Sequence, residues 1–240
     1  MQSSGSPAIQ IDGLTKSYGT YDVLHGLSML VNWGEVVSIF GPNGSGKSTL
    51  IKILATLSPA SSGKIWINGL DSQEYSHHVR RNIGVITHDM MLYSHLTGLE
   101  NLLFYGTLFH IQNVERRIME VSESLNISSF LNKRVDTMSH GMRKRISLAR
   151  SILHDPPILL LDEPDAGIDQ IALDILGNLT MSSKGKRTIV MTTHNIEIGF
   201  SLSSRIAIIS NGSISYIQES SSKTVDEFKS DYKSFTGVTN

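Results

Sequence analysis

The sequence predicts an α/β fold with a mixed β-sheet core, an antiparallel β subdomain and an α-helical subdomain. An almost continuous apolar run, Val36–Phe40, leads through a glycine-rich loop into an amphipathic helix. Such a run is typical of a parallel strand that is covered on both faces. Two similar runs, Ile158–Leu161 and Thr188–Thr192, are separated by a helix-forming stretch. This alternation of strands and helices favours a parallel sheet.

The residues around the first of these runs predict the antiparallel layer and the first helix. Residues 1–8 are mostly small and polar and are expected to be disordered, whereas Ile9–Leu14 and Val23–Leu30 have the mixed pattern of antiparallel strands. The helix after the glycine-rich loop is expected over Ser48–Leu57, because its apolar residues recur on one face. An Asn-Gly pair at 68–69 then predicts a hairpin.

The middle of the chain adds a helical insert, and the main domain ends in a second hairpin. The chain from Glu74 to Leu153 looks mainly helical, with a helical subdomain expected at about 89–153. A helix is expected over Ile171–Leu179, between the two apolar runs. An Asn-Gly pair predicts a last strand pair within Ile206–Ile217. The main domain is therefore expected to span residues 9–220.

The last residues, 221–240, are expected to form a tail outside this domain. Val225, Phe228, Tyr232 and Phe235 recur at three- and four-residue spacing, which predicts a short amphipathic helix. Packing of this helix on its own domain is favoured over docking on a partner or a membrane.

Composition excludes several classes of protein. The 240 residues carry a formal net charge of −1, with both signs mixed along the chain, so no long-range field would draw it onto nucleic acid. The absence of cysteine excludes disulfides and thiolate metal sites. No apolar run approaches the roughly 20 residues that cross a bilayer, and the first residues lack a secretion signal. A cytoplasmic location is therefore expected, with any membrane association made through a partner.

The glycine-rich loop predicts a phosphate-binding site. It matches the pattern GxxxxGK[ST] over the run Gly41, Pro42, Asn43, Gly44, Ser45, Gly46, Lys47, Ser48 and Thr49. The glycines let the backbone amides wrap around phosphate, Lys47 places a cation on the β- and γ-phosphates, and Ser48 offers its hydroxyl to Mg²⁺. The helix that follows directs its positive end at the anion. An ordinary glycine turn is disfavoured, because a buried strand precedes the loop and a helix follows it.

Polar residues that end the two later strands predict the second half of a catalytic site. The run Ile158–Leu161 ends in Asp162 and Glu163, and His194 follows the strand at 188–193. In a parallel α/β sheet these strand ends form the ligand-binding edge. Asp162 is expected to hold Mg²⁺, Glu163 to activate the water that attacks the γ-phosphate, and His194 to reach that phosphate. The sequence thus indicates a Mg²⁺-dependent nucleoside triphosphatase.

Three further segments complete a resemblance to the nucleotide-binding domain of ABC transporters, which covers the chain from about Ile9 to Ile217. They are Lys16-Ser17-Tyr18-Gly19, Met138-Ser139-His140-Gly141-Met142 at the family's LSGGQ signature, and Ala166-Gly167-Ile168-Asp169 at its D-loop. The resemblance implies that Tyr18 stacks on adenine and that Asp169 serves the ATP site. It also implies that Ser139 and Gly141 of one chain cover the ATP of a second, identical subunit. Two chains would then close around two ATP molecules.

Two positions depart from the family pattern. His88 in Ile83–His88 stands where the family has a glutamine whose side-chain carbonyl meets Mg²⁺ and water, so a neutral imidazole nitrogen would take that place. His140 replaces a signature glycine and Met142 a signature glutamine, whereas the Ser139 hydroxyl and the Gly141 amide are kept. The resemblance therefore implies an active but atypical site.

The family resemblance also implies a membrane partner. Residues 89–101 correspond to the segment that receives a permease's coupling helix, although its apolar residues are as compatible with internal packing. The exporter branch fits best, and the segments 55–57 and 153–157 are similar to the haem-exporter ATPases of cytochrome c maturation. A multidrug, lipid or polysaccharide exporter ATPase is the second interpretation, and a soluble ABC ATPase of iron–sulfur cluster assembly the third. The expected location is the inner face of the cell membrane.

Overall fold

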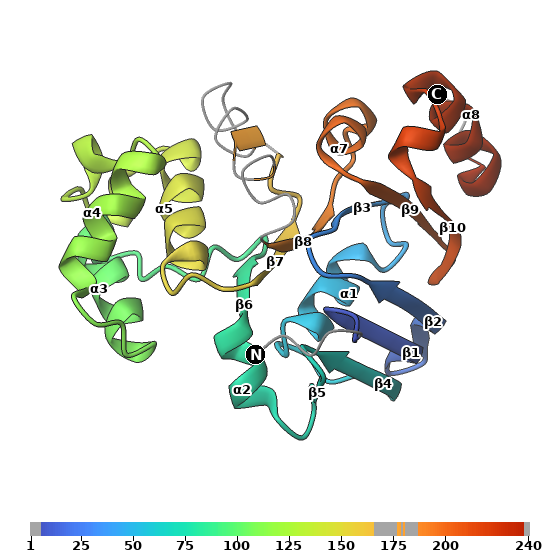
Figure 1. Cartoon of the computed structure of the whole chain (residues 1–240), viewed down its shortest axis with the longest axis horizontal. Helices are drawn as coiled ribbons and strands as arrows, with labels where there is room; N and C mark the ends of the chain where they lie inside the picture. Colours follow the sequence, from blue (N-terminus) through green and yellow to red (C-terminus); the bar gives the residue numbers. More distant parts are fainter. Residues whose placement is uncertain (1–5, 166–176, 179, 181–186, 238–240) are drawn as a thin grey trace.

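Two β-sheets and a separate group of helices make up the fold (Figure 1). The structure, a computed structural model, describes the following residues: 6–165, 177–178, 180 and 187–237. Of the residues expected to be disordered, 1–5 lie outside this described part, whereas Ala8 is buried and its carbonyl accepts a hydrogen bond from the Asn68 amide. Most of the helix expected over Ile171–Leu179 also lies outside the described residues.

The core of the molecule is a six-stranded sheet with the strand order β10-β9-β3-β8-β7-β6. Its strands are β3 (Val36–Phe40), β6 (Ile83–Ile86), β7 (Ile158–Asp162), β8 (Thr188–Thr192), β9 (Arg205–Ser210) and β10 (Ser213–Glu219). Among the strands that the structure describes, β9 and β10 form the only antiparallel pair of this sheet, so the sheet is mixed, as the sequence predicts. Every residue of β3, β7 and β8 is buried, which explains their continuous apolar sequences.

A second sheet is antiparallel, with the order β2-β1-β4-β5. Its strands are β1 (Ile9–Tyr18), β2 (Tyr21–Val31), β4 (Ser62–Ile67) and β5 (Leu70–Asp71). Both predicted hairpins are confirmed. Asn68 and Gly69 join β4 to β5, and Asn211 and Gly212 join β9 to β10, all four with positive φ. Two-residue turns of this kind need positive φ at both positions, which Asn and Gly adopt most easily.

The described helices are α1 (Lys47–Leu54), α2 (Ser76–Asn82), α3 (Gly98–Leu108), α4 (Val114–Ser124), α5 (His140–Ile152), α7 (Ile196–Leu202) and α8 (Val225–Thr236). Short 3₁₀ turns lie at Ser128–Phe130, Val135–Thr137 and Ser220–Ser222. In Figure 1, α3, α4 and α5 stand together on the left, away from the antiparallel sheet. Their apolar residues, such as Leu102, Ile118 and Ile146, form a core that is continuous with Leu159 and Leu161 of the central sheet.

The segment from Glu74 to Leu153 is less helical than its sequence suggests, because β6 lies within it and pairs with β7 at the edge of the central sheet. Four residues are too few to show a strand period beside two helices. Close packing of α5 requires the glycine in this strand. A Cβ at Gly84 would lie 2.0 Å from the Ser151 carbonyl oxygen, so no other residue fits without a shift of the helix.

The first helix also ends earlier than predicted, at Leu54 instead of Leu57. Thr56 has a φ of 58°, and the Leu57 amide donates to the Lys52 carbonyl. This 6→1 hydrogen bond is the Schellman pattern that terminates helices. Threonine is β-branched and disfavours positive φ, so propensity alone gave no sign of this end.

His154 joins the end of α5 to β6 and is held in its neutral form. Its Nε2 donates to the Ile83 carbonyl at 3.1 Å, and its ring stacks on Phe109 with 3.9 Å between the ring centroids. Burial is the main cause that lowers the pKa of His154 to about 4, although the Ile83 carbonyl opposes this shift. The folded protein therefore resists protonation of this ring in a range where the unfolded chain accepts a proton.

We expect His154 to make the protein sensitive to mild acid. Above pH 6.5 the ring is neutral in both states and costs nothing, and stability is lost as the pH falls from about 6.5 towards 4. The full loss is on the order of 3 kcal/mol in the free energy of unfolding. Urea unfolding at pH 7 and pH 4.5 measures it. His154→Gln, which keeps a donor but does not titrate, is expected to lose less stability than wild type. Equal losses would contradict the prediction, and the exposed His25→Gln is the control.

The segment in which the sequence predicts a tail helix forms α8, which packs back on the central sheet. Phe228 is fully buried, and its ring lies 5.0 Å from that of Phe40, the last residue of β3. Lys229 of α8 also donates to Glu197 of α7 at 2.9 Å. These contacts place the helix against its own domain.

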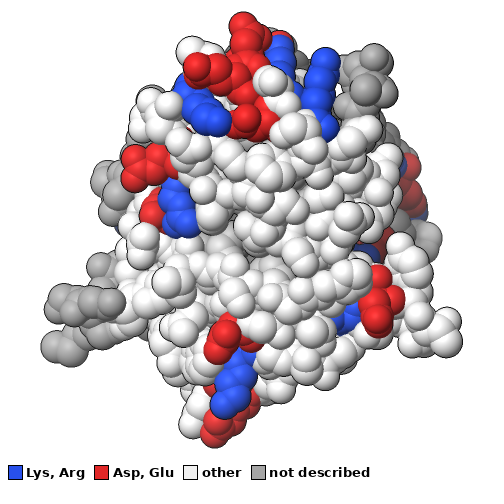
Figure 2. Space-filling view, turned by 90° about the vertical axis from the view of Figure 1, so that its right-hand side faces the viewer, with Lys and Arg blue, Asp and Glu red and all other residues white. Residues whose placement is uncertain are grey.

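Charges of both signs lie next to one another on the face shown in Figure 2. One group lies at the top of the view, the side on which Figure 1 places α8, others lie at the left, right and lower edges, and a broad area between them carries no Lys, Arg, Asp or Glu. Among the described residues on this face, no extended patch carries a single sign. In the part of the chain that the structure describes, no helix is long and apolar enough to cross a bilayer.

Candidate functional site: a phosphate loop beside two carboxylates

The glycine-rich loop lies between β3 and α1 and is shaped by its glycines. Gly46, the residue before α1, has a φ of 103°, and a Cβ there would lie 2.6 Å from a methyl group of Leu24. A Cβ at Gly41 would lie 2.3 Å from the Ile209 carbonyl oxygen. The loop is therefore packed tightly between β2 and β9, whereas Asn43 and Gly44 at its tip are exposed. The hydroxyl of Ser45 is buried and finds no hydrogen-bond partner among the described residues.

Lys47 points into the concave side of this loop. Only 5% of it is exposed, and its Nζ donates to the Gly41 and Pro42 carbonyls at 2.8 and 3.0 Å. Burial lowers the pKa of Lys47, and the negative charges of Glu163 and Asp162 partly oppose this shift. The loop thus holds a buried ammonium group that donates to two neutral carbonyls. A negatively charged phosphate oxygen would be a stronger acceptor and would replace them.

Asp162 at the end of β7 accepts hydrogen bonds from two hydroxyl groups. Ser48 and Thr192 donate to its Oδ1 at 3.0 and 2.8 Å. The three residues come from α1, β8 and β7, so the first turn after the loop meets the carboxyl ends of two central strands. A hydroxyl and a carboxylate oxygen in contact form part of an oxygen set that suits Mg²⁺.

Glu163 and His194 meet at the same edge of the sheet, with 2.6 Å between Oε1 and Nε2. Both side chains are partly exposed, so they remain accessible to a substrate and to water. The backbone of Glu163 has a φ of 49°, which is uncommon for a residue other than glycine. Its amide donates to the carbonyl and the hydroxyl of Thr192.

A cavity of about 340 Å³ opens beside these groups. Its lining combines the predicted residues with side chains from two other segments and consists of Ser48, Thr87, His88, His140, Lys144, Asp162 and Glu163. The structure thus brings the predicted metal ligand His88 to the same cavity as Ser48 and Asp162. Among the described residues, no group of three or more acidic or histidine side chains is arranged to hold a metal ion.

The first turn of α5 lies along this cavity. His140 and Lys144 are four residues apart and therefore share one face of the helix. Lys144 Nζ donates to the Glu163 carbonyl at 3.1 Å. Burial lowers the pKa of Lys144, and the carboxylates of Asp165 and Glu163 oppose this shift. The pKa of His140 is lowered by desolvation first and then by Lys144, Arg143 and His88.

The remaining predicted residues do not line this cavity. Tyr18 lies at the tip of the β1–β2 hairpin with 51% of its surface exposed, and Lys16 Nζ lies 4.7 Å from its ring centroid. Ser139 precedes α5 and accepts a hydrogen bond from the Met142 amide, and Gly141 follows in the first turn. Both belong to a partly open surface. Asp169 lies outside the described residues.

Among the residues that sequence reasoning missed, two hold the backbone of Glu163. Thr192 bridges Asp162 and the Glu163 amide, and Lys144 holds the Glu163 carbonyl. Thr192 follows an apolar run, so a polar residue at the end of a predicted central strand was the available signal. Lys144 gave a weaker signal, since a basic residue in an exposed helical turn is common. The role of Lys144 depends on its contact with Glu163, nineteen positions further along the chain, and no local sequence pattern contains such a contact.

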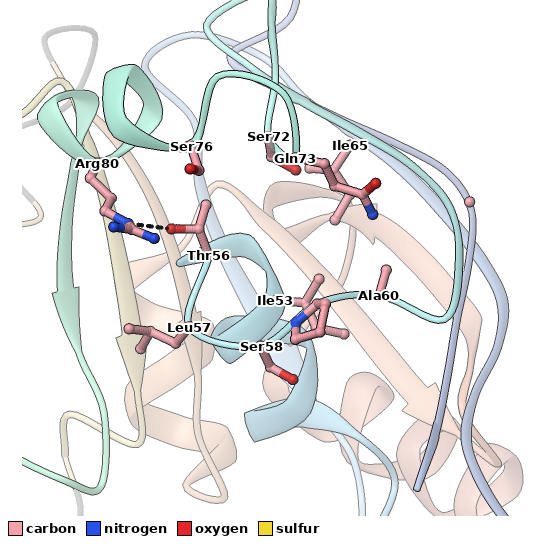
Figure 3. A pocket seen from close by; sticks show the side chains of 12 residues that line it. Ile53, Thr56, Leu57, Ser58, Ala60, Ile65, Ser72, Gln73, Ser76 and Arg80 are labelled. Carbon is pink, nitrogen blue, oxygen red and sulfur yellow. Dashed lines mark hydrogen bonds between the residues drawn. The ribbon is translucent and has the colours of Figure 1, made fainter.

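A second pocket, of about 500 Å³, opens elsewhere, between the end of α1, β4 and α2 (Figure 3). Arg80 reaches across it, and its Nε donates to the Thr56 hydroxyl at 2.9 Å. None of the predicted site residues lines this pocket. The chemistry-bearing side chains therefore converge on the smaller cavity beside the phosphate loop.

The fold and this loop define a P-loop nucleoside triphosphatase, and comparison with known proteins gives its family. The profile described as "ABC transporter" matches residues 24–166. An ABC transporter ATP-binding protein of Bacillus subtilis (strain 168) is 35% identical over 210 residues, which cover 87% of this chain and 68% of that protein. A daunorubicin resistance ATP-binding protein of Streptomyces coeruleorubidus is 34% identical over 227 residues, covering 93% and 70%.

A solved structure supports the same assignment. It is a dimeric ATP-binding cassette in a post-hydrolysis state bound to ADP and Pi, with a TM-score of 0.79 and 25% identity. The match covers 88% of this chain and 98% of that one. The chain belongs to the ABC transporter family. It binds ATP and is an ATPase of the ABC type.

Proposed function

We propose that this chain is the ATP-hydrolysing subunit of an ABC exporter, with residues 9–220 as its ATP-binding domain and 89–153 as the helical subdomain. The observation that carries the proposal is the convergence of Lys47, Ser48, Asp162, Glu163 and His194 beside one phosphate loop. The chain would work at the inner face of the cell membrane and would act on a permease that it contacts.

The loop from Gly41 to Thr49 would bind the triphosphate. Its amides and the buried Ser45 hydroxyl suit phosphate oxygens, and Lys47 would exchange its two carbonyls for the β- and γ-phosphates. Ser48, Asp162 and His88 would hold Mg²⁺, which neutralises charge on the phosphates when bound. Tyr18, exposed on the neighbouring hairpin, would stack on the adenine ring.

Glu163 and His194 would prepare the reaction. The Glu163 carboxylate would orient and deprotonate the attacking water, and the contact with Nε2 of His194 would hold its rotamer. When ATP is bound, the imidazole of His194 would donate a hydrogen bond to an oxygen of the γ-phosphate instead. These groups explain hydrolysis within one chain, but not its control.

Control would come from a second, identical chain. Ser139 and Gly141 lie at an accessible helix start, and we propose that they cover the ATP bound by the partner, together with Asp169. ATP bound between two chains favours the closed pair, and loss of the γ-phosphate contacts releases it. ATP binds the closed pair more tightly than the open one, and this difference in binding free energy would drive the movement of a permease.

The surface for that permease would be formed by residues 89–101 and α3. Tyr93 and Phe104 are half exposed and lie edge to face, with 5.0 Å between their ring centroids. The backbone of this segment is fixed from inside, because Ser147 donates to the Met90 carbonyl and Tyr105 to the Met91 carbonyl. A fixed loop that presents aromatic side chains suits docking of a short helix.

Purification of the tagged chain from detergent-solubilised membranes tests this assignment. We expect recovery of a polytopic membrane protein together with the chain, and faster ATP hydrolysis by that complex than by its Glu163→Gln variant. Recovery of cytosolic proteins alone would count against a transporter role.

The cargo is the narrower part of the proposal. The relative of this chain in Streptomyces coeruleorubidus is named for daunorubicin resistance, which favours an amphipathic drug or lipid over haem as the cargo. Haem export stays a prediction from the similarity of residues 55–57 and 153–157 to haem-exporter ATPases. Stimulation of ATP hydrolysis in the reconstituted complex by haem, or by an anthracycline, decides between them.

Replacement of His88 tests its proposed contact with Mg²⁺. In His88→Gln an amide oxygen replaces the ring nitrogen, so we expect ATP turnover within about threefold of wild type. In His88→Ala no ligand remains, and a loss of about tenfold is expected. Initial rates at varied Mg²⁺ concentration measure both. A complete loss in His88→Gln would show that the imidazole has a duty that oxygen cannot take over.

A further inference from the structure

The peptide backbone of Glu163 is held from both sides in a conformation that it would rarely adopt alone. Its φ of 49° lies in the left-handed region, which is strained for a residue with a Cβ. Such a conformation persists only where surrounding contacts fix it. The direction of the Glu163 side chain depends on it, because φ and ψ set where the Cα–Cβ bond points.

The contacts that fix this residue come from two different elements. On the amide side, Glu163 donates to the Thr192 carbonyl and hydroxyl, at 3.1 and 3.0 Å. On the carbonyl side, the Lys144 ammonium donates at 3.1 Å. Thr192 belongs to the neighbouring central strand, whereas Lys144 belongs to α5 in the helical group.

The helix α5 makes this kind of contact repeatedly. Further along the helix, Ser147 donates to the Met90 carbonyl at 3.0 Å and Arg150 to the Val85 carbonyl at 2.6 Å. The spacing of these donors keeps them on the side of α5 that faces the central sheet. Lys144 is the first of the series and the one that reaches the catalytic strand end.

We propose that Lys144 is a positioning residue for hydrolysis: its ammonium fixes the Glu163 peptide and thereby aims the Glu163 carboxylate at the attacking water. This inference rests on the proposed function for the role of Glu163, and adds a residue to it. The helix α5 begins directly after Ser139, in the segment proposed to cover the partner's ATP. Lys144 therefore connects that segment to Glu163, the catalytic acid of its own chain.

Lys144→Met is the direct test, because methionine keeps much of the side-chain length and removes the donor. We expect kcat for ATP hydrolysis to fall about tenfold, since a charge-assisted hydrogen bond is lost. The affinity for a fluorescent ATP analogue is expected to stay within about twofold, because Lys47 and the phosphate loop are unchanged. Lys144→Arg, which restores a cationic donor, is expected to recover most of kcat.

The control is the same exchange at an exposed lysine of the same region, Lys133→Met, which should leave kcat unchanged. An equal loss in Lys133→Met, weaker nucleotide binding with unchanged kcat, or no recovery in Lys144→Arg would each overturn the proposal. If Lys144→Met does not fold, Lys144→Gln takes its place, with the amide as a weaker donor and a smaller fall in kcat.

Hydrogen exchange separates this inference from the proposed function. The Glu163 amide should exchange faster in Lys144→Met than in Lys133→Met, because one of the contacts that hold the peptide is gone. This readout needs no ATP turnover. If wild type hydrolysed ATP no faster than Glu163→Gln, the proposed role of Glu163 would fail, while unchanged amide exchange would overturn the inference about Lys144 alone.

Discussion

Glu163→Gln is expected to lower kcat for ATP hydrolysis by about 100-fold or more, since a positioned general base typically contributes 10²–10⁴. The amide keeps the shape of the side chain and an oxygen 2.6 Å from His194, but it cannot take a proton from water. Nucleotide binding should persist, because Lys47 and the loop are unchanged. Phosphate release at saturating Mg²⁺-ATP measures the effect.

The same variant should also accumulate the closed pair of chains, because ATP that is not hydrolysed keeps both sites occupied. Light scattering with and without ATP measures the mass. Glu197→Gln is the control: its carboxylate is exposed and pairs with Lys229 on α8. Similar turnover in the two variants, or a strictly monomeric Glu163→Gln protein saturated with ATP beside its permease, would contradict the mechanism.

Lys47→Met is expected to weaken ATP binding by more than 100-fold. The lysine is buried beside the loop, and loss of one partner of a desolvated charge contact costs about 3 kcal/mol or more. ATP hydrolysis should fall with occupancy. Titration with a fluorescent ATP analogue measures the dissociation constant.

The matched control for this change is Lys52→Met, in the last turn of the same helix. It removes the same charge but lies away from the loop, so the affinity for ATP should change by less than about twofold. If both variants bound ATP equally well, the loop would not be the nucleotide site.

Local signals were sufficient for much of the fold. The buried strands β3, β7 and β8 were visible because continuous apolar runs need cover on both faces, and both Asn-Gly hairpins because only such residues adopt positive φ readily. β6 was hidden because its length is short and its place at the sheet edge is set by Gly84 against α5. That contact is tertiary and has no local pattern.

The candidate site divides in the same way. Ser48 follows the phosphate loop, and Asp162 and Glu163 lie at the end of β7; the order of strands in a parallel sheet brings the three together, as the sequence predicts. The contact of Lys144 with the Glu163 backbone depends on how α5 lies on the sheet. The helix angle is fixed by packing, so no motif announces this contact.

Side chains of α5 and of its neighbour α3 donate hydrogen bonds to main-chain carbonyls, a group that every amino acid has. Ser147 holds the loop at Met90 and Tyr105 holds it at Met91, whichever side chains stand at those two positions. Mutations there can reshape the outward surface while the loop keeps its path and its distance from the ATP. Substitutions at these two positions could thus adapt the surface to a different membrane partner without a change in the geometry of the ATP site.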